Sequence, residues 1–164
     1  MTAYSWAAGS GNWSTAGNWT PGGGPPSTSA DTAVLSGPLP YTVTLDVNET
    51  IGALSFNDFA ATLAIGSHQL TVTNAGGQAG TVTVGSDGGS ITISGGTLSA
   101  TNGIAVTNLT GFGTLIGTIL HAGTISGTST YLASGGTLRF ESAIQDSNLQ
   151  LAIANTSASI RPAG

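Results

Sequence analysis

The feature that most constrains this chain is a short apolar–polar–apolar run that recurs with glycine or asparagine between copies. Six such runs occupy residues 54–56, 63–65, 70–72, 82–84, 91–93 and 98–100. The last three runs copy the first three, each 28 positions further along the chain. Alternation with a period of two predicts short β-strands, and recurrence of a three-strand unit predicts strands that stack on copies of themselves. The sequence therefore predicts an all-β solenoid.

The rest of the chain shows the same pattern of apolar runs separated by turn residues. Apolar runs continue to residue 160, and Gly-Thr followed by Leu or Ile recurs before several of them. Glycine supplies the positive φ that a sharp corner requires, and threonine favours the extended state that follows. An antiparallel β-sandwich also has short strands and glycine-rich turns, and it is the alternative fold. The copied three-run unit favours the solenoid.

Charged residues make up only 5% of the chain, against roughly 25% in an average protein. Lysine is absent, and the basic residues are Arg139 and Arg161. Such a surface cannot neutralise many phosphates, which argues against nucleic-acid binding and against attraction to anionic lipid. Cysteine is also absent, so disulfides and thiolate metal sites are excluded, and this composition suits an exported protein. Weak self-repulsion permits close packing of copies.

No stretch approaches the roughly 18 apolar residues of a membrane helix, so no membrane insertion is expected. The first residues, Met1 to Trp6, lack the basic start and apolar core of a secretory signal. Either the protein is exported by another route or a signal has been lost from this chain. The sequence leaves both options open.

Residues 1–30 differ from the rest and are expected to form an N-terminal cap on the coils of residues 31–164, within one structural domain. This segment holds Trp6, Trp13 and Trp19, the sequence Gly-Asn-Trp twice, and a Gly/Pro tract at 21–26. A stack of coils needs an atypical unit to close its apolar end, so we interpret the tryptophans as a hydrophobic lid. The alternative is that these rings, together with Tyr41, stack against sugar rings.

The opening of the chain, from Tyr4-Ser5-Trp6 through the two Gly-Asn-Trp sequences, resembles the N-terminal solenoid regions of large bacterial surface or secreted proteins. Residues 31–34, 41–44, 51–54, 117–126 and 134–138 resemble the segments and repeat units that follow in those proteins. The likeness is to autotransporter passengers and to β-solenoid segments that precede self-processing Hint-type domains. It implies a right-handed parallel β-helix in a surface, adhesive or matrix role. It carries over no catalytic residue, because the matching motifs are structural.

A chemical site is hard to find in the sequence. The acidic residues are Asp31, Asp46, Glu49, Asp58, Asp87, Glu141 and Asp146. Only Asp46 and Glu49 are close together, and they lack a calcium-loop pattern, so we interpret them as a solvated turn. Asp87 is interpreted as a turn residue, His121 as an edge residue, and His68 and His121 are too far apart in sequence to suggest a metal site. We therefore expect no enzyme activity, no cofactor and no bound metal.

The function that these observations favour is that of a non-catalytic, extracellular structural protein that self-associates into surface or matrix filaments. Copies are expected to join head to tail at a C-terminal end made by Ile160, Arg161 and Pro162, the last two being weak edge blockers. The alternative is an adhesin or carbohydrate-binding module that holds cell-surface or matrix polysaccharide with the N-terminal aromatic residues. A fragment of a polysaccharide lyase is a further and weaker alternative.

Overall fold

A computed structural model describes residues 1–37, 40–57, 60–84, 89–119, 130–141, 144, 150–154 and 157–162. This part of the chain is all-β, with two 3-10 helices, η1 (Ala16–Asn18) and η2 (Asn74–Gly76), which confirms the predicted class. Its strands are β1 (Thr2–Trp6), β2 (Gly11–Asn12), β3 (Trp19–Thr20), β4 (Asp31–Leu35), β5 (Tyr41–Leu45), β6 (Glu49–Ile51), β7 (Ala53–Phe56), β8 (Ala61–Ile65), β9 (Gln69–Val72), β10 (Thr81–Val84), β11 (Ser90–Ala100), β12 (Gly103–Ile104), β13 (Asn108–Ile116), β14 (Thr130–Phe140), β15 (Gln150–Ile153) and β16 (Ser159–Arg161).

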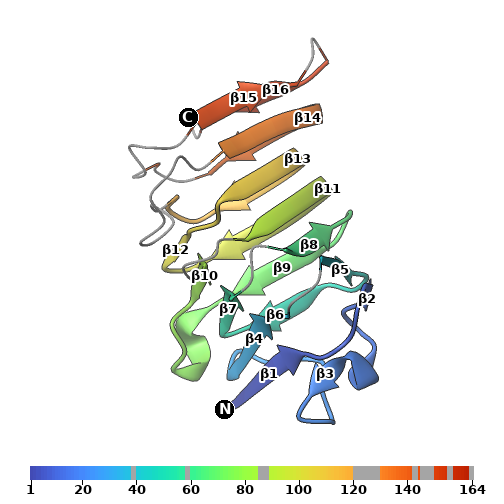
Figure 1. Cartoon of the computed structure of the whole chain (residues 1–164). Helices are drawn as coiled ribbons and strands as arrows, with labels where there is room; N and C mark the ends of the chain where they lie inside the picture. The colour runs from blue at the N-terminus through green and yellow to red at the C-terminus, as the bar shows by residue number, and fades with distance from the viewer. Residues whose placement is uncertain are drawn as a thin grey trace.

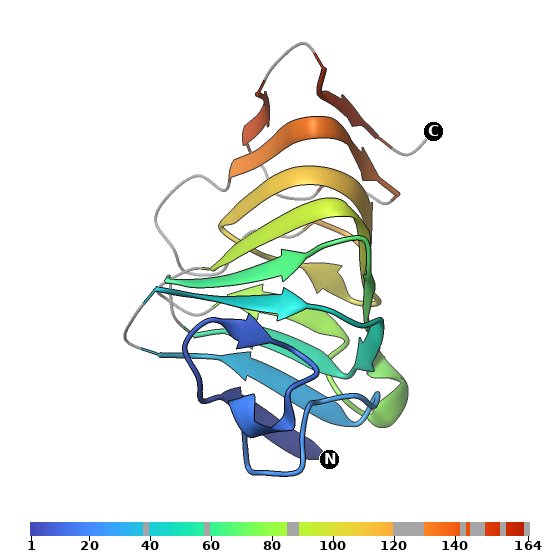
Figure 2. The same ribbon diagram turned by 90° about the vertical axis from the view of Figure 1, so that its right-hand side faces the viewer.

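The strands lie one above another in two sheets (Figures 1 and 2). Among the described strands, the smaller sheet ends at β12, and the larger one continues to β15 and β16 near the C-terminus. One sheet has the order β12-β10-β7-β4-β1-β3, and the other contains β15-β14-β13-β11-β8-β5-β2 together with β6, β9 and β16. Within the described residues, β1 and β3 form the single antiparallel pair, and all other strand pairs are parallel. This pairing differs from that of an antiparallel sandwich.

The 28-residue offset between copies in the sequence equals the offset between paired residues in the sheets. Leu54 pairs with Val82, Leu63 with Ile91, and Leu70 with Leu98. Each apolar run therefore lies directly beside its copy, as predicted. A slip of one residue would turn every one of these side chains to the opposite face, so the apolar pattern itself fixes the pairing.

The preceding unit is shorter, because Ala33 pairs with Leu54, only 21 positions further along. The difference comes from the connection between successive units. Gly52 alone joins β6 to β7, whereas residues 73–80 join β9 to β10. The longer connection folds back along the sheets, where the Gln78 side chain donates to the Ala30 carbonyl and accepts from the Thr32 hydroxyl. The seven extra residues thus tie a later unit to an earlier one.

The runs at 91–93 and 98–100, which the sequence predicts as separate strands, belong to one continuous strand, β11, that bends at glycine. In β11 the bend lies at Gly95 and Gly96, and the register with β13 shifts between Ser94 and Thr97. Gly95 has a φ of +93°, which an L side chain seldom adopts. Similar bends occur in β13 and β14. The glycines therefore redirect a strand without ending it.

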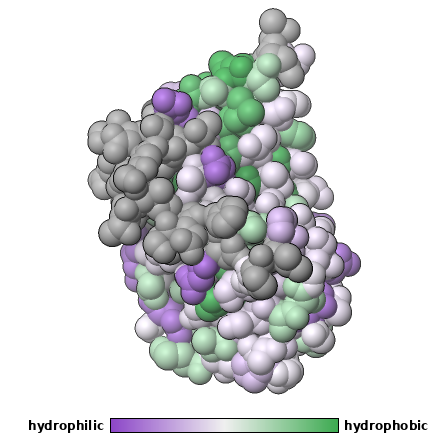
Figure 3. Space-filling model, viewed as in Figure 1, coloured by the Kyte–Doolittle hydropathy of each residue, from purple (hydrophilic) through white to green (hydrophobic). Residues whose placement is uncertain are grey.

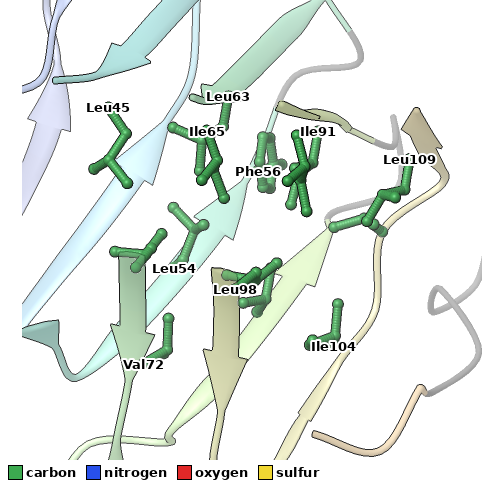
Figure 4. Close-up of a cluster of buried hydrophobic side chains, with 14 of the residues drawn as sticks. Leu45, Leu54, Phe56, Leu63, Ile65, Val72, Ile91, Leu98, Ile104 and Leu109 are labelled. Atoms are coloured by element: carbon green, nitrogen blue, oxygen red, sulfur yellow. The ribbon is translucent and has the colours of Figure 1, made fainter. Parts of the chain in front are cut away.

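The core is a set of apolar ladders that run through the sheets (Figure 4). One ladder consists, in register order, of Val43, Leu63, Ile91, Leu109, Tyr131 and Leu151. The neighbouring ladder consists of Leu45, Ile65, Ile93, Gly111, Ala133 and Ile153. Small residues occupy the second ladder beside Tyr131, whose ring stacks at 6.3 Å on that of Phe140. Large and small side chains thus compensate across neighbouring ladders.

Candidate functional site

The N-terminal end of the strand stack is filled by the three indole rings. Trp6, Trp13 and Trp19 are 4%, 0% and 2% exposed. The ring of Trp19 makes edge-to-face contacts with both others, at centroid distances of 5.0 Å to Trp6 and 4.8 Å to Trp13. Each indole N–H donates to a backbone carbonyl, so burial leaves no polar atom of these rings unpaired. The arrangement closes the first rung of the core with aromatic surface.

Tyr41 belongs to the same cluster. Its ring lies parallel to that of Trp6 at 6.4 Å, and the residue is 6% exposed. Stacking on a sugar requires an open ring face, and these four rings turn their faces to one another and to the core. The burial of these four residues is what the lid interpretation requires, and both the lid and the glycan-stacking interpretations stay predictions.

Asp46 fastens the cap to the sheet. Its carboxylate accepts hydrogen bonds from the Ser14 backbone N–H at 3.0 Å and from the Ser14 hydroxyl at 2.6 Å. Partial burial alone would raise the pKa of Asp46, but the Ser14 bonds outweigh it, and with nearby His68 they hold the pKa below its ordinary value. The Asp46 carboxylate is therefore a charged anchor between the loop after β2 and the end of β5.

Glu49 stands three residues further on, as the first residue of β6. Residues 46–48 lie between β5 and β6, which agrees with the predicted turn, but Glu49 is half-buried and not fully solvated. It pairs with Leu70, so it occupies the foot of the ladder Leu70, Leu98, Leu115 and Phe140. Burial raises the pKa of Glu49 and repulsion from Asp46 adds to the rise, although the Thr50 N–H favours the carboxylate.

The opposite pKa shifts predict opposite effects of pH at these two positions. Because folding lowers the pKa of Asp46, the Asp46 carboxylate stabilises the folded state at pH values above its unfolded-state pKa. This stabilisation is lost as the pH falls through the folded-state pKa. Asp46→Asn should therefore lower the free energy of unfolding at neutral pH and have no effect in acid. Urea unfolding over a pH series measures this difference.

Glu49→Gln is the matched control for that series. Because folding raises the pKa of Glu49, the folded state favours the protonated side chain, and this stabilisation is fully present below the unfolded-state pKa. The stabilisation is lost as the pH rises through the folded-state pKa. The Gln variant should thus be at least as stable as the parent at neutral pH and equal to it in acid. A neutral-pH loss of stability in Glu49→Gln, or none in Asp46→Asn, would contradict the assignment.

Within the described residues, core positions of the last rung are exposed, whereas the aromatic residues at the N-terminal end are buried. Leu151 and Ile153 continue the two core ladders, yet they are 43% and 56% exposed, and Ile144 is 40% exposed. Hydrophobic residues accordingly reach the surface at the end of the stack that carries β15 and β16 (Figure 3). Among the described strands, β15 and β16 each pair with β14 alone, so each has one free edge.

The residues predicted to form a self-association end lie here. Ile160 pairs with Leu138 and is half-buried, while Arg161 and Pro162 are exposed beyond it. Sequence reasoning missed Leu151, Ile153 and Ile144, because their alternation is that of a buried strand. What exposes them is the lack of a further described strand on the last rung, and no local pattern signals that.

Other candidate sites have little support in the described part of the chain. It contains no group of three His, Asp or Glu side chains placed to hold a metal ion. No helix in it is long and apolar enough to cross a bilayer. Asp58, Asp87, His121 and Asp146 lie outside the described residues, so the interpretations of Asp87 as a turn residue and His121 as an edge residue stay predictions.

Comparison of the chain with protein-family models, with curated proteins and with solved structures finds no match. The two ends of the stack, one closed by aromatic rings and one with exposed core residues, are therefore the observations on which a function must rest.

Proposed function

We propose that this chain is a non-catalytic structural module: a right-handed parallel β-helix that self-associates through its C-terminal end into extracellular filaments. The described fold supports the β-helix part of the proposal. Parallel partners such as Tyr41 and Ala61, or Thr130 and Gln150, lie 20 residues apart, which is enough chain for one coil. Connections between parallel strands of one sheet are right-handed in nearly all proteins, which supports the hand.

The observation that carries the functional proposal is the uncovered last rung of the core. Leu151 and Ile153 hold ladder positions whose counterparts on the preceding rung, Tyr131 and Ala133, are fully buried. Among the strands that the structure describes, β15 and β16 on this rung each have one edge without a partner strand. Exposed core-type side chains beside unpaired backbone groups form a template for another chain. Docking on this rung would bury the side chains and pair the edges at once.

The composition supports association between copies in an extracellular setting. With so few charged residues, two copies approach each other with little repulsion. The chain has no cysteine, so an oxidising environment cannot cross-link it wrongly. Its polar surface is built from hydroxyl and amide side chains, which suits a passive structural role.

The test is a substitution at the open end. Leu151→Asp places a charge on the exposed last rung, where it should cost little folding stability and abolish association. Thr44→Asp is the matched control, because it adds the same charge at an exposed position on β5, far from that end. Sedimentation velocity over a concentration series measures both, with circular dichroism to verify folding.

The parent and Thr44→Asp should sediment faster as concentration rises, and Leu151→Asp should stay a single small species. A parent that remains one species at every concentration would overturn the proposal. So would Leu151→Asp if it assembled as readily as the parent.

A further inference from the structure

The two arginines of this chain lie side by side. Arg139 and Arg161 are its only lysine or arginine residues, and they are far apart in the sequence. They pair with each other in the register of β14 and β16, two adjacent parallel strands near the C-terminal end of the stack (Figure 1). Adjacent strands lie about 4.8 Å apart, so the two side chains leave the sheet as close neighbours. The arginine charge of the molecule is therefore concentrated at one place.

Both arginine side chains are accessible on the outer face of the sheet. Leu138 and Phe140 are buried in the core, so Arg139 between them projects to the opposite side. The Arg139 side chain is 57% exposed, and Arg161 is exposed as well. A ligand in solution can thus reach both guanidinium groups at once.

Within the described residues, one carboxylate is paired with these two cations. Arg139 Nε donates to Glu141 Oε1 at 2.9 Å, and the Glu141 backbone N–H donates to the Leu115 carbonyl, which keeps Glu141 in line with the end of β14. Arg161 takes part in no ion pair found in that part of the chain. Like charges opposite each other on neighbouring strands destabilise a sheet, and a further carboxylate between them would relieve the repulsion.

The groups around the arginines indicate what kind of carboxylate fits. A guanidinium presents its N–H donors in a planar fork that matches the two oxygens of a carboxylate. Two positions earlier on the same strands, the hydroxyls of Thr137 and Ser159 share a hydrogen bond of 2.7 Å. Such a pair uses one of its two O–H groups and keeps the other as a donor. A carboxylated sugar carries both a carboxylate and hydroxyls on one residue, whereas an acidic protein side chain carries the carboxylate alone.

We infer that Arg139 and Arg161 form a binding site for a carboxylate of an acidic polysaccharide, with Thr137 and Ser159 contacting the neighbouring sugar hydroxyls. The site lies on the outer face of the sheet, and the inference does not depend on self-association of the chain. The net charge of −5 repels a polyanion from the rest of the surface, so attachment is confined to this site.

The experiment is native electrophoresis of the full chain at low salt, through gels that contain polygalacturonate, dextran or poly-L-glutamate. Dextran is neutral and controls for sieving. Polygalacturonate should retard the parent relative to dextran, and the dependence on polymer concentration gives the affinity. Arg161→Gln should weaken this affinity about tenfold, the size expected for loss of a charge-assisted hydrogen bond. Thr44→Asp lowers the net charge by the same one unit and should bind as the parent does.

Two further variants test the geometry of the site. Arg161→Lys keeps the charge and should recover only part of the affinity, because an ammonium group lacks the planar fork. Glu141→Gln should strengthen binding, because it frees the Arg139 guanidinium. Glu49→Gln raises the net charge equally and should leave the affinity unchanged. Circular dichroism verifies that each variant is folded.

The outcomes decide between this site and its alternatives. Binding of polygalacturonate that is weakened in folded Arg161→Gln and strengthened in Glu141→Gln would support the inference. An unretarded parent would overturn it, and so would equal weakening in Arg161→Gln and Thr44→Asp, which would show that net charge alone governs binding. Retardation by poly-L-glutamate and not by polygalacturonate would also overturn it, since the partner would then be an acidic protein.

Discussion

Trp13→Ala should lower the free energy of unfolding by about 3–5 kcal/mol, the usual cost of truncating a fully buried aromatic residue. Trp13 is 0% exposed, its ring packs edge-to-face on Trp19, and its indole N–H donates to the Pro26 carbonyl at 3.1 Å. The substitution leaves a cavity at the first rung and leaves that carbonyl without its donor. Urea unfolding followed by the fluorescence of Trp6 and Trp19 measures the loss.

Thr15→Ala is the control for this prediction. Thr15 is exposed two residues after Trp13, and its side chain makes no capping hydrogen bond to η1. Its truncation should change the free energy of unfolding by less than about 0.5 kcal/mol. A cost below about 1 kcal/mol for Trp13→Ala would mean that the aromatic cap adds little to the stack, which would contradict the account of the N-terminal end.

Gly111→Ala should destabilise the protein by about 3 kcal/mol or more, by combining backbone strain with overpacking. Gly111 has a φ of +122° and lies in a core ladder between Ile93 and Ala133. A Cβ at this position would meet the Ile93 backbone, with its carbonyl carbon at 2.9 Å and its nitrogen at 3.1 Å. The Ile93 backbone cannot move aside without breaking the β11–β13 pairing, so the clash with the added methyl group cannot be relieved at low energetic cost.

Gly77→Ala separates the two causes. Gly77 also has a positive φ, of +77°, but a Cβ there meets no atom within 4 Å. It should therefore cost only the conformational part, about 1–2 kcal/mol. Chemical denaturation of both variants gives the comparison. Equal losses at the two positions would show that close contact between β11 and β13 does not limit the residue at 111.

The sequence contains enough information to predict the pairing of the middle strands. Leu54, Leu63 and Leu70 meet their copies in the register that the repeat predicts, because burial of one face allows no other pairing. The length of one unit could not be read in the same way. The one-residue corner at Gly52 and the long connection 73–80 occupy equivalent positions in successive units. Their equivalence is visible only in the hydrogen bonds that each makes to the preceding unit.

The corners and the ends show where local patterns fail. Gly95 and Gly96 look like a turn between two strands, but the strand continues through them and pairs with β13 on both sides of the bend. Alternation places Leu151 and Ile153 in the core, and they hold core positions, but exposure depends on what covers the last rung. Glu49 could be identified as a turn neighbour, while its place at the foot of an apolar ladder follows from long-range pairing with Leu70.

The most direct test of the central claim is electron microscopy of the purified protein over a concentration series. We expect filaments at high concentration whose axial repeat matches the length of one strand stack, formed by copies that all point the same way. Their growth should disappear in Leu151→Asp. Dispersed short rods of a single stack at every concentration would contradict the claim that the open C-terminal end joins copies of this chain.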